Sequence, residues 1–160
     1  MAQLNYINIA GHSRIGVNLT DIVGPGAPNK PDDVALIQAL LRYIGKALGK
    51  DAMGVLDAWP LPKTTGRWDT TTEIYVRGYK AEYANRLLNG LNPDQRIHPA
   101  AYKGRVVRNP MRPLMMITHM HLYALVAASE SGHNDYVKEI VSMMPLFMRV
   151  GLFRPHWSDA

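Results

Sequence analysis

The residues of this chain best suited to metal chemistry are His119 and His121, which are separated by a single methionine. Side chains two positions apart on a helix point in different directions, so the two imidazoles cannot easily share one metal ion. The next carboxylates along the chain are those of Glu130 and Asp135, and there is no cysteine to supply a thiolate ligand. We therefore predict no metal site and no cofactor, and we expect both histidines on a helix surface or at a subunit contact.

Local motifs of catalysis are absent from the sequence. It contains neither a G-x-S-x-G nucleophile elbow nor an H-E-x-x-H metalloprotease motif. The turn at Gly24–Gly26 is not a phosphate-binding loop, because Lys30 is followed by proline and because prolines remove backbone donors that would hold a phosphate. We predict that the protein is not an enzyme, and a hydrolase site formed only in space is the alternative.

Aromatic and basic side chains are both frequent in the middle of the chain. Aromatic faces stack on sugars and cations attract acidic groups, so this combination predicts a ligand site. The candidate ligand-binding residues are Trp68, Tyr102, Arg67, Arg96 and Arg105. The alternative is that the cations are scattered over the surface and only keep it hydrated.

The composition fits one domain, with or without arms, since the chain has 160 residues. Lys and Arg number 18 against 13 Asp and Glu, which gives a formal net charge of +5. The cations form no dense run, so nucleic acid is not an expected partner. The longest apolar run, 115–128, is interrupted by polar residues, and no secretory pattern opens the chain. We predict a soluble protein without a signal peptide and without membrane insertion.

The best-defined element is a stiff Gly/Pro loop that leads into an amphipathic helix over 32–48. Prolines in the loop fix φ and remove donors, so neither a strand nor a helix can continue through it. Asp32 and Asp33 place negative charge at the helix amino terminus, and Gly49 ends the helix. We predict one apolar helix face, and a loop that fixes where the helix begins instead of holding a ligand.

Two extended segments precede this loop. Residues 4–9 alternate between apolar and polar side chains, and residues 15–22 form a second extended run. Two short strands do not make a stable sheet alone. They are expected to pair as a hairpin, to pack on the helices or to add to the sheet of a partner.

The following loop and helix supply most of the remaining candidates. Residues 50–65 are predicted to form a loop pinned to the core, with Trp59 as its anchor. Asp69 is the candidate N-cap of a helix that runs to Leu88, with Lys80 on its exposed face.

Two more helices are predicted in the last third of the chain. They span 113–131 and 134–148, and Pro145 is expected to bend or end the second one. The segment 151–157 is apolar for a terminus and is expected to dock on the core or on a neighbouring subunit.

Three segments of the chain form a pattern when they are taken together. They are the loop and helix of residues 23–41, the segment 66–74 with its Gly66, Asp69 and Thr72, and the turn at 89–99. This pattern resembles the peptidoglycan-binding-like domain family. The resemblance spans 16–102 and, more weakly, the helix at 114–128. The chain departs from the family pattern at Gln95, which replaces a glycine, at residues 78–80, which replace a Phe-Gln pair, and in its long insertion at 50–65.

This resemblance implies a compact helical unit without catalytic activity that often targets a partner to the cell wall. Its closest variants occur in phage-related and bacterial secretion-associated proteins. We therefore expect an all-α fold, a small peptidoglycan-binding-like bundle with an extended N-terminal arm and a C-terminal helical appendage. The expected boundaries are 1–22 for the arm, 23–132 for the bundle and 133–160 for the C-terminal helix and tail.

The expected function is that of a non-catalytic binding or structural module, a component of a phage virion or tail or of a contractile injection apparatus. Its partners would be protein subunits of the assembly, and peptidoglycan is a further candidate. The candidate interface residues are Tyr6, Ile7, Met144, Phe147, Phe153 and Trp157. The alternatives are a free-standing wall-binding accessory to a lytic enzyme, in the bacterial cytoplasm or exported with a partner, and a small wall hydrolase.

Overall fold

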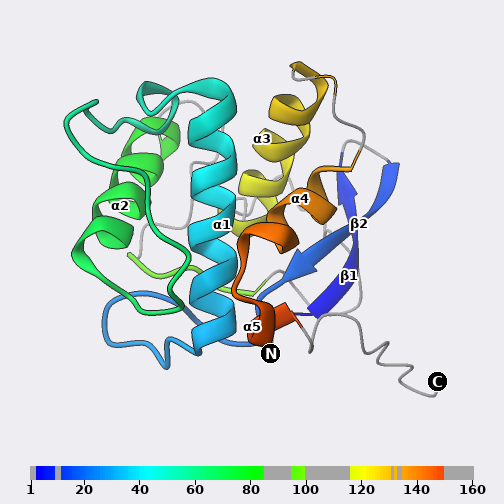
Figure 1. Cartoon of the computed structure of the whole chain (residues 1–160), viewed down its shortest axis with the longest axis horizontal. Helices are drawn as coiled ribbons and strands as arrows, with labels where there is room; N and C mark the ends of the chain where they lie inside the picture. Colours follow the sequence, from blue (N-terminus) through cyan, green and yellow to red (C-terminus); the bar gives the residue numbers. More distant parts are fainter. Residues whose placement is uncertain are drawn as a thin grey trace.

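The computed structural model describes residues 3–9, 12–84, 95–99, 116–130, 132 and 135–149. Helices predominate among these residues, which confirms that part of the prediction. In chain order the elements are the strands β1 (Gln3–Ile9) and β2 (His12–Asn18), the helix α1 (Pro31–Leu48), the short 3-10 helix η1 (Asp51–Met53), and the helices α2 (Thr70–Ala84), α3 (Met116–Glu130), α4 (Tyr136–Met143) and α5 (Leu146–Arg149). Helix α1 stands between α2 on one side and α3, α4 and the strands on the other (Figure 1).

Helix α1 is the centre of the hydrophobic core. Every residue from 33 to 41 is buried, so the helix is covered around its whole circumference over this stretch. The sequence predicted burial of one apolar face only, and this prediction was wrong for residues 33–41. A helix that other elements enclose buries the side chains on all of its faces. The predicted bounds hold to within one residue, because α1 begins at Pro31 and ends before Gly49, whose φ is +86°.

The two N-terminal strands pair with each other as an antiparallel hairpin. In its register Tyr6 lies opposite Ile15, and Ile7 lies opposite Arg14. Of the three alternatives that the sequence left open, two are observed together, because the strands pair as a hairpin and the hairpin contacts α3 and α4. Strand β2 ends at Asn18 and not at Ile22, because the residues that follow turn to meet α1.

Helix α2 begins as the sequence predicts. The carboxylate of Asp69 accepts hydrogen bonds from the backbone N–H and the hydroxyl of Thr72, at 2.7 and 2.6 Å. The predicted end at Leu88 lies outside the described residues. Lys80 was expected on the exposed face but is buried, and its Nζ donates to the carbonyl of Arg96 at 2.6 Å.

Helices α3, α4 and α5 form the C-terminal part of the described structure. The expected ends of α3 at 113 and 131, and the expected start of α4 at 134, lie outside the described residues. Asp135 caps α4 by accepting from the N–H of Lys138. The chain then leaves the helix before Pro145 and resumes with the short α5, which confirms that the proline interrupts this segment.

The loop after η1 is only partly attached to the core. Met53 and Val55 are buried, as predicted for a pinned loop. The prediction for Trp59 was wrong, because this side chain is 40% exposed. Its backbone carbonyl accepts from the hydroxyl of Tyr75, and its N–H donates to the carbonyl of Leu56. Within the described ranges, no helix combines the length and the apolar content that crossing a bilayer requires.

Candidate functional site

The Gly/Pro loop is held in shape by hydrogen bonds within it. The side-chain amide of Asn29 accepts from the N–H of Gly24 at 2.8 Å and donates to the carbonyl of the same residue at 2.9 Å. Asn29 itself has a φ of +49°, a conformation that asparagine tolerates better than most residues. The polar side chain of this loop is thus used to close the loop on itself.

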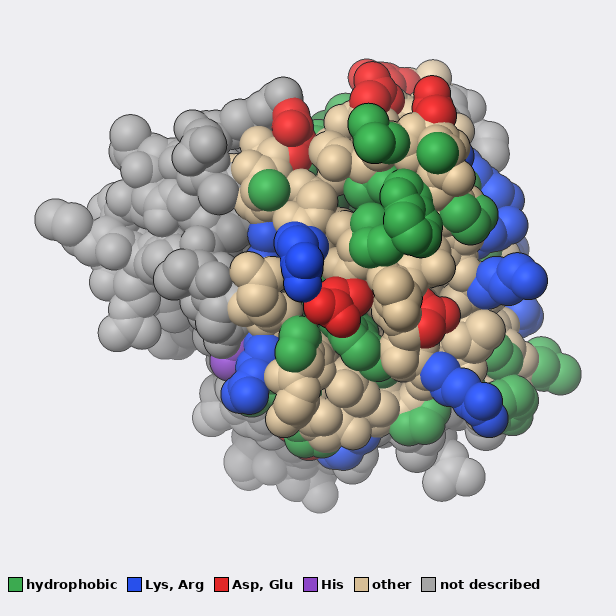
Figure 2. Space-filling model, turned by 90° about the vertical axis from the view of Figure 1, so that its left-hand side faces the viewer, with side chains coloured by type: hydrophobic (Ala, Val, Ile, Leu, Met, Phe, Trp, Pro, Cys, Tyr) green, Lys and Arg blue, Asp and Glu red, His purple; other side chains and the backbone are tan. Residues whose placement is uncertain are grey.

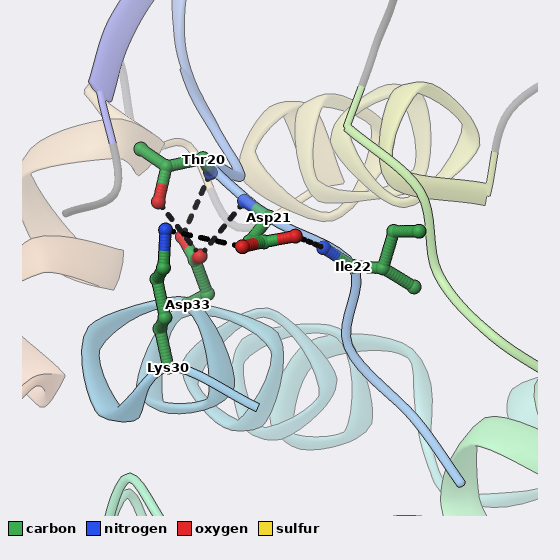
Figure 3. Close-up of polar contacts among 5 residues, drawn as sticks. All are labelled: Thr20, Asp21, Ile22, Lys30 and Asp33. Atoms are coloured by element: carbon green, nitrogen blue, oxygen red, sulfur yellow. Dashed lines mark hydrogen bonds and ion pairs between the residues drawn. The ribbon is translucent and has the colours of Figure 1, made fainter. Parts of the chain in front are cut away.

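The carboxylate of Asp33 fastens the start of α1 to the chain that leaves β2 (Figure 3). It accepts three hydrogen bonds, from the N–H of Thr20 at 2.9 Å, from the hydroxyl of Thr20 at 2.8 Å and from the N–H of Asp21 at 3.0 Å. Burial raises the pKa of Asp33, and the bonds from Thr20 act in the opposite direction. An acidic residue expected to interact mainly with the helix dipole is therefore also a cross-link between two segments.

Asp21 makes further contacts beside the hydrogen bonds of Asp33. Its carboxylate accepts from the N–H of Ile22 at 2.8 Å and pairs with the ammonium of Lys30 at 3.1 Å (Figure 3). The hydrogen bond from Ile22 and the neighbouring Lys30 lower the pKa of Asp21. The ion pair is solvent-exposed and contributes little to stability.

Gln38 connects the first two of the three segments on which the family resemblance rests. This fully buried side chain accepts from the N–H of Gly66 at 3.0 Å and donates to the carbonyl of Arg67 at 2.8 Å and to the hydroxyl of Thr72 at 2.9 Å. A polar group that makes three bonds inside the core fixes the position of the α2 amino terminus against α1.

The first and third segments are joined through the backbone. Val23 and Ile97 form an antiparallel bridge, with N–H to carbonyl distances of 3.0 and 2.7 Å. Gly24 has a φ of +139°, and a Cβ there would lie 2.9 Å from the Cα of Arg96. Glycine is needed at this position because another backbone approaches it closely.

The predicted ligand-binding residues divide into three groups. Arg67 and Trp68 precede α2, where the arginine is exposed and the indole is half-buried against the core. Arg96 is exposed, and its Nε donates to the carbonyl of Pro25 at 3.0 Å. Tyr102 and Arg105 lie outside the described residues. Arg96 therefore has a clear structural partner in the Gly/Pro loop.

The two histidines lie in the interior, which corrects the expectation of surface positions. His119 faces α2, where its Nδ1 lies 2.7 Å from the hydroxyl of Tyr79, and its ring packs against Tyr83 and Tyr123. His121 faces α4 and β2. Burial lowers the pKa of each histidine to about 4. The two imidazoles do diverge, and among the described residues no three His, Asp or Glu side chains are arranged to hold a metal ion.

An open groove lies at the end of α1 opposite the Gly/Pro loop. It is lined by Ala47, Leu48, Asp51, Ala52, Glu82, Tyr83, Tyr123, Val126 and Glu130. Its three carboxylates come from η1, α2 and α3, and the rings of Tyr83 and Tyr123, which pack against each other, also line it. The groove can accept hydrogen bonds from a cationic group. No local pattern marks it in the sequence, because four elements contribute to it.

The predicted interface residues differ in whether their side chains are exposed. Met144 lies in the core, so its side chain is not available on the surface of this fold. Phe147 on α5 is 75% exposed, and the neighbouring Leu146, which the sequence reasoning missed, is 74% exposed. Tyr6 and Ile7 belong to β1, whereas Phe153 and Trp157 lie outside the described residues.

A second exposed apolar region lies in the loop between η1 and α2. Leu56 is 76% exposed, next to the partly exposed Trp59. Figure 2 shows the face formed by α2 and this loop, with a cluster of apolar side chains in its upper half, acidic side chains above and below that cluster, and Lys and Arg at several separate places. On this face the described Lys and Arg side chains are spread out and do not form a single basic stripe.

Comparisons of the chain with family models, with curated proteins and with solved structures produced no match in any of the three.

Proposed function

We propose that the chain is a non-catalytic structural module whose copies assemble with one another and with other protein subunits. The observation that carries this proposal is the adjacent pair Leu146 and Phe147, about three-quarters exposed on α5. Large apolar side chains that are adjacent and exposed gain free energy when a partner covers them. The assembly we infer is a phage virion, a tail or a contractile injection apparatus, in which a peptidoglycan-binding-like fold is reused for subunit contacts.

The hydrogen bonds of the family-like segments support a structural reading of those segments. Asn29, Asp33, Gln38 and Asp69 each direct their polar atoms to groups of the same chain. A side chain that already satisfies buried donors and acceptors cannot exchange them for a ligand without a cost in stability. These residues therefore serve to hold the segments together, which leaves contacts with partners to the exposed surface.

The alternative function is that of a wall-binding accessory to a separate lytic enzyme. It rests on the exposed guanidinium groups of Arg67 and Arg96 and on the half-buried ring of Trp68. A pull-down on purified peptidoglycan separates the two proposals. Retention that the substitutions Arg67→Ala, Trp68→Ala and Arg96→Ala abolish would favour wall binding, whereas a chain that stays in the supernatant favours assembly. A clearing band in zymography would overturn the non-catalytic proposal.

The absence of cysteine from the sequence allows a direct test of assembly through α5. The variant Phe147→Cys carries a single thiol on the proposed contact, and Leu56→Cys is a matched control with an equally exposed thiol elsewhere. If copies meet through α5, mild oxidation converts the first variant rapidly into disulfide-linked dimers while the second stays largely monomeric. Equal rates for the two thiols would contradict the proposal.

A further inference from the structure

His121 lies at the junction of three elements that are far apart in the sequence. The side chain projects from α3, is fully buried, and makes hydrogen bonds to β2 on one side and to α4 on the other. Its Nε2 is 2.6 Å from the carbonyl oxygen of Val17, and its Nδ1 is 3.1 Å from the hydroxyl of Tyr136. The side chain therefore connects the N-terminal hairpin to the helices.

These partners determine where the proton of the imidazole resides. A carbonyl oxygen can only accept, so Nε2 carries the hydrogen and donates to Val17. In the neutral ring Nδ1 is then the acceptor, and the hydroxyl of Tyr136 donates to it. The neutral ring fits this junction in one tautomer only. A second proton on Nδ1 would make this nitrogen a donor that faces the donated hydrogen of the Tyr136 hydroxyl, so this hydrogen bond would be lost.

The surroundings of His121 offer little compensation for a positive charge. Among the described residues, the groups that face it are the carbonyl of Val17 from β2 and the hydroxyl and ring of Tyr136 from α4. Burial dominates the lowering of its pKa, and no charged side chain of the described residues contributes to it. The charged form is therefore favoured in a state in which water reaches the ring.

The hairpin joins the hydrophobic core through Val17, whose side chain is fully buried. Release of the hairpin would therefore expose this side chain to water. The two strands of the hairpin pair with each other over the full register from Gln3–Asn18 to Ile9–His12. The chain beyond it is fastened independently, since Asp33 holds the N–H groups of Thr20 and Asp21. The contact to His121 lies at Val17, on the hairpin side of this fastening.

We propose that His121 is a pH-sensitive clasp, whose protonation releases the β1–β2 hairpin from α3 and α4 while the remaining helices stay folded. His119 does not take part in this step. Its hydrogen bond is to Tyr79 on α2, and its ring packs in a tyrosine cluster on the other side of α3. Opening of the hairpin is therefore linked to the uptake of one proton, and unfolding of the whole domain to the uptake of at least two.

Hydrogen exchange of the intact protein tests this difference. With a pKa of about 4 in the closed state and about 6.5 in the open state, the opening constant of the hairpin rises about 30-fold between pH 7.5 and pH 5. Two short strands are not stable alone, so the released hairpin unpairs and its amides exchange. After correction for intrinsic exchange rates, the amides of β1 and β2 should show this one-proton dependence, and the most protected amides of α1 a steeper one. Identical pH dependence in both sets would overturn the proposal.

Three glutamine variants assign the proton to its residue. His121→Gln keeps a donor for the carbonyl of Val17 but cannot titrate, so the pH dependence of the hairpin amides should disappear. His119→Gln and His12→Gln, the latter within β2 itself, should leave that dependence in place. Persistence of the dependence in His121→Gln would contradict the clasp, and if that variant does not fold, the exchange of the wild-type amides still decides.

Discussion

The interior and the exposed surface of this protein depart from the usual distribution of residues in opposite directions. Inside, Asp33, Gln38 and the two histidines are buried, and each has hydrogen-bond partners from another segment. On the surface, large apolar side chains on α5 and in the loop after η1 lie open to solvent. Buried polar groups specify which segments meet, whereas exposed apolar groups are stabilised only when something covers them. The comparison assigns the buried polar residues to the fold and the exposed apolar pair on α5 to a partner.

The largest effect is expected for Gln38→Leu. This substitution removes three hydrogen bonds and leaves the N–H of Gly66 buried without an acceptor. We expect a loss of about 4 kcal/mol in the free energy of unfolding, measured by urea denaturation. Lys46→Ala, an exposed substitution on the same helix, is the control and should change it by less than about 0.5 kcal/mol. A loss below about 1 kcal/mol for Gln38→Leu would mean that this residue does not hold α2 against α1.

The next effect is expected for Asp33→Asn. The amide offers one acceptor oxygen where the carboxylate has two, and its NH₂ group would face an N–H or hydroxyl donor of Thr20 or Asp21. Relief of the buried charge offsets part of this cost, so we expect a loss of about 2 kcal/mol at neutral pH. The matched change Asp32→Asn on the adjacent residue should cost less, about 0.5 kcal/mol, through the weakened interaction with the helix dipole. Equal losses of unfolding free energy for the two variants would show that the hydrogen bonds of Asp33 to Thr20 and Asp21 do not stabilise the fold.

Tyr79→Phe is expected to have a smaller effect. It leaves Nδ1 of His119 without its hydroxyl partner in the core, which should cost about 1 kcal/mol in thermal or urea unfolding. Tyr43→Phe is the matched control, because among the described residues the buried hydroxyl of Tyr43 has no hydrogen-bond partner. Its removal should be neutral or stabilising. If the two phenylalanine variants lose the same stability, the bond to His119 contributes nothing specific.

The sequence was a good guide where structure depends on neighbours along the chain. The cap at Asp69, the end of α1 at Gly49 and the interruption at Pro145 follow from local backbone chemistry. The Gly/Pro loop was also predicted to be structural, and its hydrogen bonds agree with that interpretation.

The sequence was a poor guide where the partner comes from a distant element. Whether a histidine lies inside depends on what packs over it, and the partners of His121 come from β2 and α4. The same holds for Trp59. Its aromatic ring favours burial, but the side chain is 40% exposed in the loop after η1. Gln38 did carry a signal, because it is four residues after Val34 and three before Leu41 within the apolar pattern of α1.

The smallest effect on stability, and the largest on association, is expected for the double substitution of Leu146 and Phe147 by serine. Both side chains are about three-quarters exposed, so the free energy of unfolding of the isolated chain should change by less than about 0.5 kcal/mol. Urea denaturation at low protein concentration checks this part. A large loss would show that α5 belongs to the core of the fold and not to its contact surface.

The central claim is tested most directly by the molar mass in solution, measured by light scattering over a range of protein concentrations. The account predicts that the wild-type chain self-associates as its concentration rises, that Leu146→Ser with Phe147→Ser abolishes this association, and that the control Leu56→Ser retains it. A wild-type mass that stays at 17.9 kDa at every concentration, or equal association in all three proteins, would contradict the assignment of α5 as the contact between subunits.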